Sequence, residues 1–206
     1  MMYRYIKRII DFILSLFGIV ALIPIYLVLI VVIRFKLGSP IFFIQERSTL
    51  NGRSFSLLKF RTMTNKTDSD GNLLPDELRK TSFGSWLRNT SLDELPELLN
   101  ILKGDMTIIG PRPMPSKYNI YFSDYEKKRF KVRGGLLPPE VLKDNPTPTW
   151  DEQLQWEAEY GEDCSFFIDL KILFRKNDNY GEYVRKSLSE ERTEKNNAYE
   201  SSNTSA

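Results

Sequence analysis

The sequence predicts an α+β, mainly helical protein that is attached to a membrane through its N-terminal segment. Three observations lead to this class. Residues 12–33 carry no charged side chain and contain one proline, Pro24. The dipeptide Asn51-Gly52 lies between two short apolar runs, which is typical of a β-hairpin. Four leucines then recur at helical spacing between positions 95 and 102, which indicates helices in the remaining part.

The composition limits the chemistry that the chain can perform. Its 206 residues are enough for one domain with a hydrophobic core. Lys and Arg number 29 against 27 Asp and Glu, and the basic residues are scattered, so we expect no nucleic-acid partner. A single cysteine, Cys164, excludes an internal disulfide, and the absence of histidine excludes histidine-based catalytic triads. A nucleophile or base must therefore be Asp, Glu, Lys, Tyr or Cys164.

The apolar segment 12–33 is long enough for a transmembrane helix, which needs about 20 residues. Basic residues flank both of its ends, and the positive-inside rule would place one flank of a spanning helix on the unfavourable side. Pro24 removes one helical hydrogen bond near the middle. A helix that enters, bends at Pro24 and returns to the same face explains both features. A spanning helix with a proline kink fits these features equally well.

A hairpin is predicted at the start of the soluble part. Residues 40–45 and 55–61 are short apolar runs on either side of Asn51-Gly52, and we expect them to pair. Residues 65–75 are polar and predict an exposed loop. A lid over a site is the alternative function of this loop.

The leucine pattern predicts a helix that ends at Gly104. A capping box from Ser91 to Glu94 would put Pro96 at the fifth helical position, where its missing N–H weakens the helix. A cap at Asp93 would put Pro96 in the first turn, where proline is tolerated. We favour the second start, which leaves Asp93 at the positive end of a helix.

Further segments follow this helix. An apolar run at 106–109 meets a rigid turn that orients Arg112. Residues 118–132 combine aromatic and basic side chains and predict either an interfacial or a solvated helix. Residues 166–174 are apolar on most sides and predict either a buried helix or one in the lipid headgroup layer. Residues 187–206 have almost no apolar content and predict a disordered tail.

The adjacent carboxylates Asp93 and Glu94 are the candidate catalytic residues. An isolated Asp-Glu pair is most often a solvated helix start, and only the surrounding motif favours catalysis. Mg²⁺ prefers one or two carboxylates together with phosphate oxygens, so this pair could hold Mg²⁺ beside a diphosphate. Basic side chains of the neighbouring segments could bind the phosphates: Lys59, Arg61, Arg88 and Arg112.

Taken in order, the motifs of the chain resemble the bacterial sugar transferase family, the small monotopic phosphoglycosyl transferases. They are Gln45-Glu46-Arg47, Lys59-Phe60-Arg61-Thr62-Met63, Arg88, Leu92-Asp93-Glu94-Leu95-Pro96, Asn100, Gly104-Asp105-Met106 and Gly110-Pro111-Arg112-Pro113. The resemblance implies transfer of a sugar phosphate from a UDP-sugar to undecaprenyl phosphate with release of UMP. Asp93 would be the nucleophile, assisted by Glu94, with Mg²⁺ between this pair and the diphosphate.

The resemblance also implies how the chain is arranged at the bilayer. The family has a re-entrant N-terminal helix that breaks at a proline matching Pro24, with the active site on the cytoplasmic face of the bacterial inner membrane. We therefore expect a re-entrant helix at 1–36, a catalytic domain at 37–186 and a tail at 187–206. Such enzymes begin glycoconjugate or exopolysaccharide synthesis, so downstream glycosyltransferases are expected partners.

Two departures from the family pattern stand out. Ile23 occupies the position where the family usually has serine, and residues 134–149 replace a characteristic segment of the family. The arginine of that segment falls at Asn145, and Lys143 could supply the phosphate contact instead. A catalytically degenerate member, which binds a nucleotide-sugar or a partner without turnover, is therefore the alternative. A simple anchored interaction domain would leave the ordered motifs to coincidence.

Overall fold

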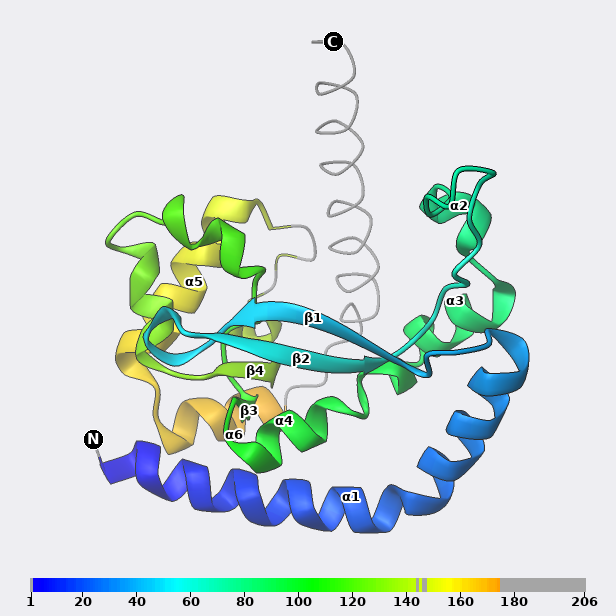
Figure 1. The fold of residues 1–206 in the computed structure, drawn as a ribbon. Coiled ribbons are helices and arrows are strands. Elements are labelled where there is room, and N and C mark those ends of the chain that lie inside the picture. Colours follow the sequence, from blue (N-terminus) through cyan, green and yellow to red (C-terminus); the bar gives the residue numbers. More distant parts are fainter. Residues whose placement is uncertain (1, 144, 146–147, 175–206) are drawn as a thin grey trace, which may run out of the picture.

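The computed structural model describes residues 2–143, 145 and 148–174, so the expected tail at 187–206 lies outside the described residues. The fold is α+β with helices dominating, as predicted (Figure 1). The helices are α1 (Met2–Lys36), α2 (Asp76–Arg79), α3 (Ser82–Asn89), α4 (Glu97–Lys103), α5 (Trp150–Asp163) and α6 (Phe166–Phe174). The strands are β1 (Phe42–Ser48), β2 (Ser54–Phe60), β3 (Met106–Ile109) and β4 (Gly134–Leu137).

Helix α1 is continuous over 35 residues and contains Pro24 in its interior. Figure 1 shows that it runs along one side of the molecule and turns in its second half to pass α3. The predicted break is therefore a bend within one helix. Among the described residues, α1 is the one helix long and apolar enough to cross a membrane, and only 11% of its most apolar stretch is buried. A surface of this kind marks contact with a partner or with lipid.

Polar side chains attach the first part of α1 to the rest of the protein. Asp11 is buried and accepts hydrogen bonds from the Thr107 hydroxyl at 2.6 Å and from the Ile108 N–H at 3.1 Å. Lys7 forms a buried ion pair with Asp169 of α6. These contacts fix α1 against β3 and α6. They could not be predicted, because an aspartate near the start of an apolar segment could as well lie in solvent.

The hairpin prediction is confirmed. Strands β1 and β2 pair antiparallel from Phe42 opposite Phe60 to Ser48 opposite Ser54, and Asn51 adopts a positive φ of 59° in the connecting turn η1 (Leu50–Gly52). A second sheet of two parallel strands, β3 and β4, pairs Met106 with Gly134. This second sheet was not predicted, and β4 lies in the segment that departs from the family pattern.

Two segments had alternative predictions, residues 118–132 and residues 166–174. Residues 118–132 form no α-helix; they contain the end of the 3₁₀ segment η3 (Ser116–Ile120) and the whole of the 3₁₀ segment η4 (Glu126–Lys131). Helix α6 buries only Asp169 and Ile172 and leaves most of its apolar side chains exposed. It is therefore not a core helix, which favours a position at an interface.

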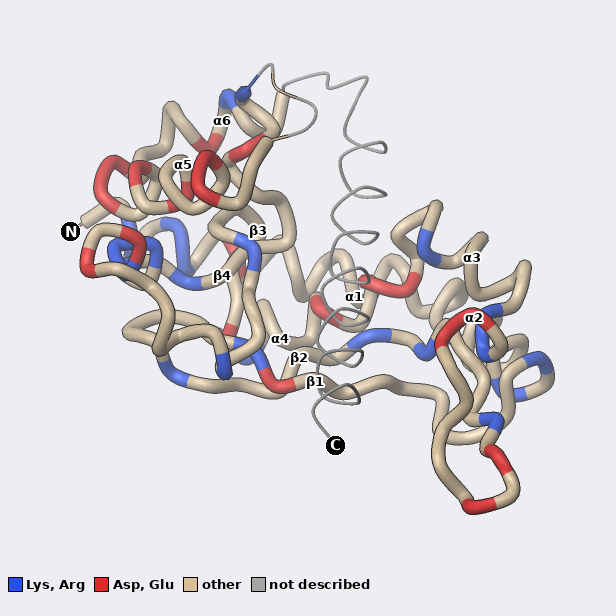
Figure 2. The backbone as a smooth tube through the Cα atoms, turned by 90° about the horizontal axis from the view of Figure 1, so that it is seen from above, with Lys and Arg blue, Asp and Glu red and all other residues tan. Residues whose placement is uncertain are grey.

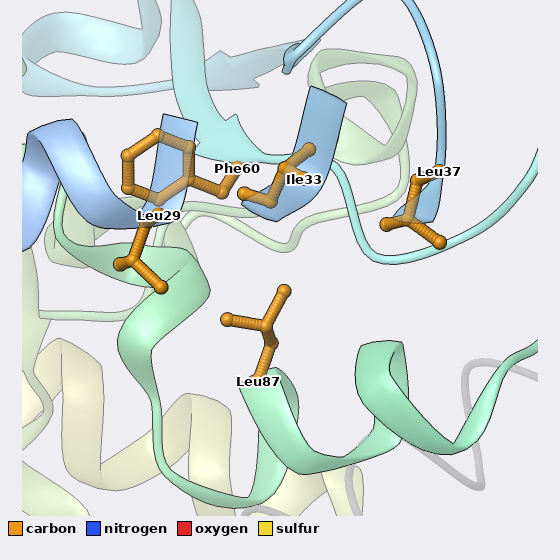
Figure 3. Close-up of a cluster of buried hydrophobic side chains, with 5 residues drawn as sticks. All are labelled: Leu29, Ile33, Leu37, Phe60 and Leu87. Carbon is orange, nitrogen blue, oxygen red and sulfur yellow. The ribbon is translucent and has the colours of Figure 1, made fainter. Parts of the chain in front are cut away.

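The buried hydrophobic side chains of the described residues form three small clusters. The cluster shown in Figure 3 consists of Leu29 and Ile33 of α1, Leu37 just after it, Phe60 of β2 and Leu87 of α3. It fixes the second part of α1 beside the strand and the helix that carry Lys59 and Arg88. Figure 2 shows basic and acidic positions spread over the molecule, which agrees with the absence of a basic block in the sequence.

Candidate active site

The carboxylate pair lies in a 3₁₀ turn immediately before α4. This turn, η2 (Leu92–Glu94), follows Ser91 in a left-handed conformation at φ 54°, and no side-chain capping bond forms at Ser91. Both predicted helix starts are therefore wrong, because α4 begins at Glu97 with Pro96 at its N-cap. Pro96 has no N–H to donate, so the turn and the helix remain separate. The predicted stop is confirmed, since Gly104 adopts φ 97° at the C-cap.

Asp93 is 8% exposed. Burial raises its pKa from 3.8 to about 6, against the opposing charges of Lys59 and Arg88 and with the Glu94 charge adding to the rise. The carboxylate is therefore desolvated, yet it titrates below neutral pH. A carboxylate in this state is available as a nucleophile at pH 7.

Lys59 joins Glu94 to a third carboxylate that the sequence analysis missed. Its Nζ lies 2.7 Å from Glu94 Oε1 and 3.2 Å from Glu97 Oε1. Burial raises the pKa of Glu94, but the charges of Lys59 and Arg112 outweigh it and lower the pKa overall. Burial raises the pKa of Glu97 to about 7 despite Lys59. Glu94 is therefore ionised at neutral pH, whereas Glu97 titrates near it.

Arg112 approaches the same carboxylates from the turn after β3. Its Nη2 lies 3.9 Å from Glu94 Oε1, and its side chain is 25% exposed. Arg47 donates to the Pro113 carbonyl at 3.2 Å and so holds this turn to β1. Glycine is required behind the turn, because a Cβ at Gly135 would lie 2.1 Å from the Gly110 nitrogen.

The other two predicted phosphate-binding residues, Arg88 and Arg61, have different surroundings. Arg88 lowers the pKa of Asp93 and donates to Thr62 Oγ1 at 2.8 Å. Arg61 is 5% exposed and donates to the Leu37 and Ser39 carbonyls after α1. Arg61 therefore holds the segment that follows α1, whereas Arg88 acts on Asp93 itself.

In the described part of the atypical segment after Arg133, Lys143 pairs with α5 and not with the carboxylate pair. Lys143 lies 3.6 Å from Glu159 Oε2 and 5.3 Å from the Trp156 ring centroid, and Asn145 donates to Glu152 at 3.3 Å. The position of Lys143 therefore does not support the expectation that it supplies the phosphate contact of the family arginine.

The site is linked directly to the bent helix α1. Tyr26 of α1 donates a hydrogen bond to the Leu95 carbonyl, one residue beyond Glu94. The arrangement therefore combines two ionisable carboxylates with cations from β2, α3 and the turn after β3, beside a long exposed apolar helix. It can bind a phosphate group and deliver a carboxylate to it.

These features define an enzyme of the phosphoglycosyl transferase class. The chain belongs to the bacterial sugar transferase family, whose family model matches residues 2–180. The resemblance stated from the motifs is thereby confirmed.

Relatives of known sequence support the same assignment. The chain is 42% identical over 168 residues to the uncharacterized sugar transferase EpsL of Bacillus subtilis. The match covers 82% of this chain and 83% of EpsL. It is 30% identical over 186 residues to the exopolysaccharide production protein ExoY of Sinorhizobium fredii, with 82% of each chain covered.

A third relative is longer. The chain is 32% identical over 178 residues to the UDP-glucose:undecaprenyl-phosphate glucose-1-phosphate transferase of Xanthomonas campestris pv. campestris. The match covers 81% of this chain but 37% of that protein, so the likeness concerns one part of it.

Proposed function

We propose that this protein transfers a sugar phosphate from a UDP-sugar to undecaprenyl phosphate, with release of UMP, and so begins glycoconjugate or exopolysaccharide synthesis. One observation carries the proposal: the adjacent carboxylates of buried Asp93 and partly buried Glu94 meet Lys59, Arg88 and Arg112. The names of the Xanthomonas and Sinorhizobium relatives support both the reaction and the process.

Asp93 is the proposed nucleophile. One oxygen of its carboxylate forms a bond to the phosphorus that carries the sugar, and the bond from this phosphorus to the bridging oxygen breaks. UMP leaves with that oxygen, and the sugar phosphate remains on Asp93. A phosphate oxygen of undecaprenyl phosphate then attacks the same phosphorus, which frees the carboxylate and completes the transfer. Both steps are substitutions at one phosphorus and need no oxidant or reductant.

The basic residues act on the phosphates. Arg112 and Lys59 offset the charge that gathers around the phosphorus, and Arg112 can donate two parallel hydrogen bonds. Because Lys59 already lies between Glu94 and Glu97, it also keeps Glu94 ionised. Arg88 lowers the pKa of Asp93, which keeps the nucleophile in its reactive form.

Mg²⁺ fits the donor set of this site. The described part of the chain has no group of three or more His, Cys, Asp and Glu side chains arranged for a metal ion. Asp93 and Glu94 offer the one or two carboxylates that Mg²⁺ prefers when phosphate oxygens complete its shell. The ion would neutralise charge on the diphosphate, and it would favour the ionised form of Asp93, whose pKa burial raises to about 6.

We propose that α1 is re-entrant and that the site faces the cytoplasm at the inner membrane. The polar contacts of Lys7 and Asp11 hold the first part of α1 against the domain, and the cluster around Ile33 holds its end there as well. A helix fixed to one domain at both ends enters and leaves on one face, with both basic flanks on the favourable side.

UMP release by purified protein, with undecaprenyl phosphate, Mg²⁺ and a panel of UDP-sugars, tests the reaction. We expect release with one or a few sugars and loss of release with EDTA. Release by wild-type protein excludes the catalytically degenerate alternative. Tight binding of a UDP-sugar without any turnover would instead establish that alternative.

A further inference from the structure

A buried ion pair holds the backbone of Arg112 from both sides. The Arg112 N–H donates to Glu157 Oε1 at 2.9 Å, and the Arg112 carbonyl accepts from Arg129 Nη2 at 2.5 Å. The same Arg129 Nη2 lies 2.7 Å from Glu157 Oε2, and the two side chains are 2% and 0% exposed. One guanidinium and one carboxylate therefore enclose the peptide groups of a residue whose side chain reaches the catalytic carboxylates.

The two elements that carry this pair are fixed to each other. Arg129 belongs to η4 and Glu157 to α5, and a Cβ at Gly161 would lie 2.3 Å from the Lys128 carbonyl oxygen. The helix backbone thus contacts η4 directly. The Arg129 guanidinium also lies 5.2 Å and 5.5 Å from two phenylalanine rings, which restricts its orientation.

Stability alone gives a weak reason for this arrangement. Replacing a buried ion pair by apolar side chains of similar volume is often neutral or even stabilising. A second carboxyl group, Glu140, is also buried against Glu157, and burial followed by the Glu157 charge raises its pKa well above the ordinary value. The protein therefore buries three ionisable groups behind Arg112, namely Arg129, Glu140 and Glu157, at positions where apolar side chains could pack instead.

We propose that Arg129 and Glu157 are positioning residues, which act through the backbone of Arg112 to direct its side chain at the transferred phosphate. This inference rests on the proposed function and adds Arg129 and Glu157 to the residues on which the reaction depends. Since a misplacement of about 1 Å can lower a rate roughly 100-fold, a pair that fixes a peptide group can control the rate without contacting substrate.

The test is a coupling experiment on Arg112. The double variant Arg129→Met/Glu157→Leu is made in the wild-type and in the Arg112→Ala backgrounds, and kcat and KM for UMP release are measured. With Arg112 present, we expect the double variant to lower kcat roughly 10- to 100-fold with little change in KM. In the Arg112→Ala background we expect a further loss of about twofold or less, because the pair has no side chain left to position.

Two further measurements keep the test decisive. Where Arg112→Ala turns over too slowly for steady-state kinetics, the rate of UMP release in a single turnover, with enzyme in excess over UDP-sugar, gives the same cycle. If the double variant does not fold, Glu157→Gln replaces it; this variant keeps an acceptor for the Arg112 N–H and should lower kcat severalfold only when Arg112 is present.

The chain also offers a matched control. Lys131 and Glu162 form an exposed ion pair between the same two elements, η4 and α5. Lys131→Gln/Glu162→Gln should leave kcat unchanged. An equal loss in both Arg112 backgrounds, or no loss in either, would overturn the positioning role. Wild-type protein that binds UDP-sugar but releases no UMP would count against the proposed function instead.

Discussion

The acidic side of the pH profile tests the state of Asp93 in detail. Its pKa of about 6 lies above the ordinary 3.8 because the carboxyl is buried. The ionised carboxylate is the reactive form, so activity should rise with pH through this value. About 91% of Asp93 is ionised at pH 7 and about 9% at pH 5, which predicts an approximately tenfold fall in rate between them. With an ordinary pKa, more than about 90% would still be ionised at pH 5.

The measurement is kcat/KM for the UDP-sugar between pH 4.5 and 8, which reports groups of the free enzyme. Because bound Mg²⁺ favours the carboxylate, the acidic limb should move to lower pH as Mg²⁺ is raised, and it should extrapolate to about 6 at low Mg²⁺. Arg88→Gln should move the limb to higher pH, since Arg88 lowers the pKa of Asp93.

Glu97 is the required control, because its pKa of about 7 lies in the same range. Glu97→Gln should leave a limb near pH 6. An acidic limb near pH 4 in the wild type at low Mg²⁺ would refute the burial argument. If the limb disappeared in Glu97→Gln, it would belong to Glu97 and not to Asp93.

Three further predictions follow from particular contacts. Lys59→Met should lower kcat/KM for UMP release roughly 10- to 150-fold, the equivalent of one charge-assisted hydrogen bond, and a change below threefold would contradict its role. Asp11→Ala should lower the free energy of unfolding in detergent by about 2–4 kcal/mol, because the Thr107 hydroxyl and a neighbouring N–H lose their buried acceptor; an unchanged denaturation midpoint would contradict this docking. Cysteines introduced as Met2→Cys and Lys36→Cys, in a background without Cys164, should both react with a membrane-impermeant thiol reagent only from the cytoplasmic side. Labelling of the two positions from opposite sides would establish a spanning helix.

Features encoded in short stretches of sequence were predictable. The hairpin follows from Asn51-Gly52 between two apolar runs, and the end of α4 follows from Gly104. The candidate pair Asp93-Glu94 and the cations at Lys59 and Arg112 could also be named in advance, because the motif keeps them in order along the chain.

Features that depend on distant contacts were not predictable. The parallel pairing of β3 with β4 joins Met106 to Gly134, and a strand that begins with two glycines has no local strand signal. Arg61 and Arg112 look alike in sequence, yet one binds carbonyls after α1 and the other faces Glu94. Which of many charged residues is buried, such as Glu97, is decided by packing alone.

The central claim is the covalent step at Asp93, and intact-protein mass after a rapid quench tests it most directly. Wild-type protein mixed with its UDP-sugar and Mg²⁺, without undecaprenyl phosphate, should gain the mass of one sugar phosphate and release up to one equivalent of UMP. Peptide mapping should place the added mass on Asp93, and folded Asp93→Asn protein should show neither adduct nor UMP. Release of UMP at the wild-type rate by Asp93→Asn would contradict the mechanism.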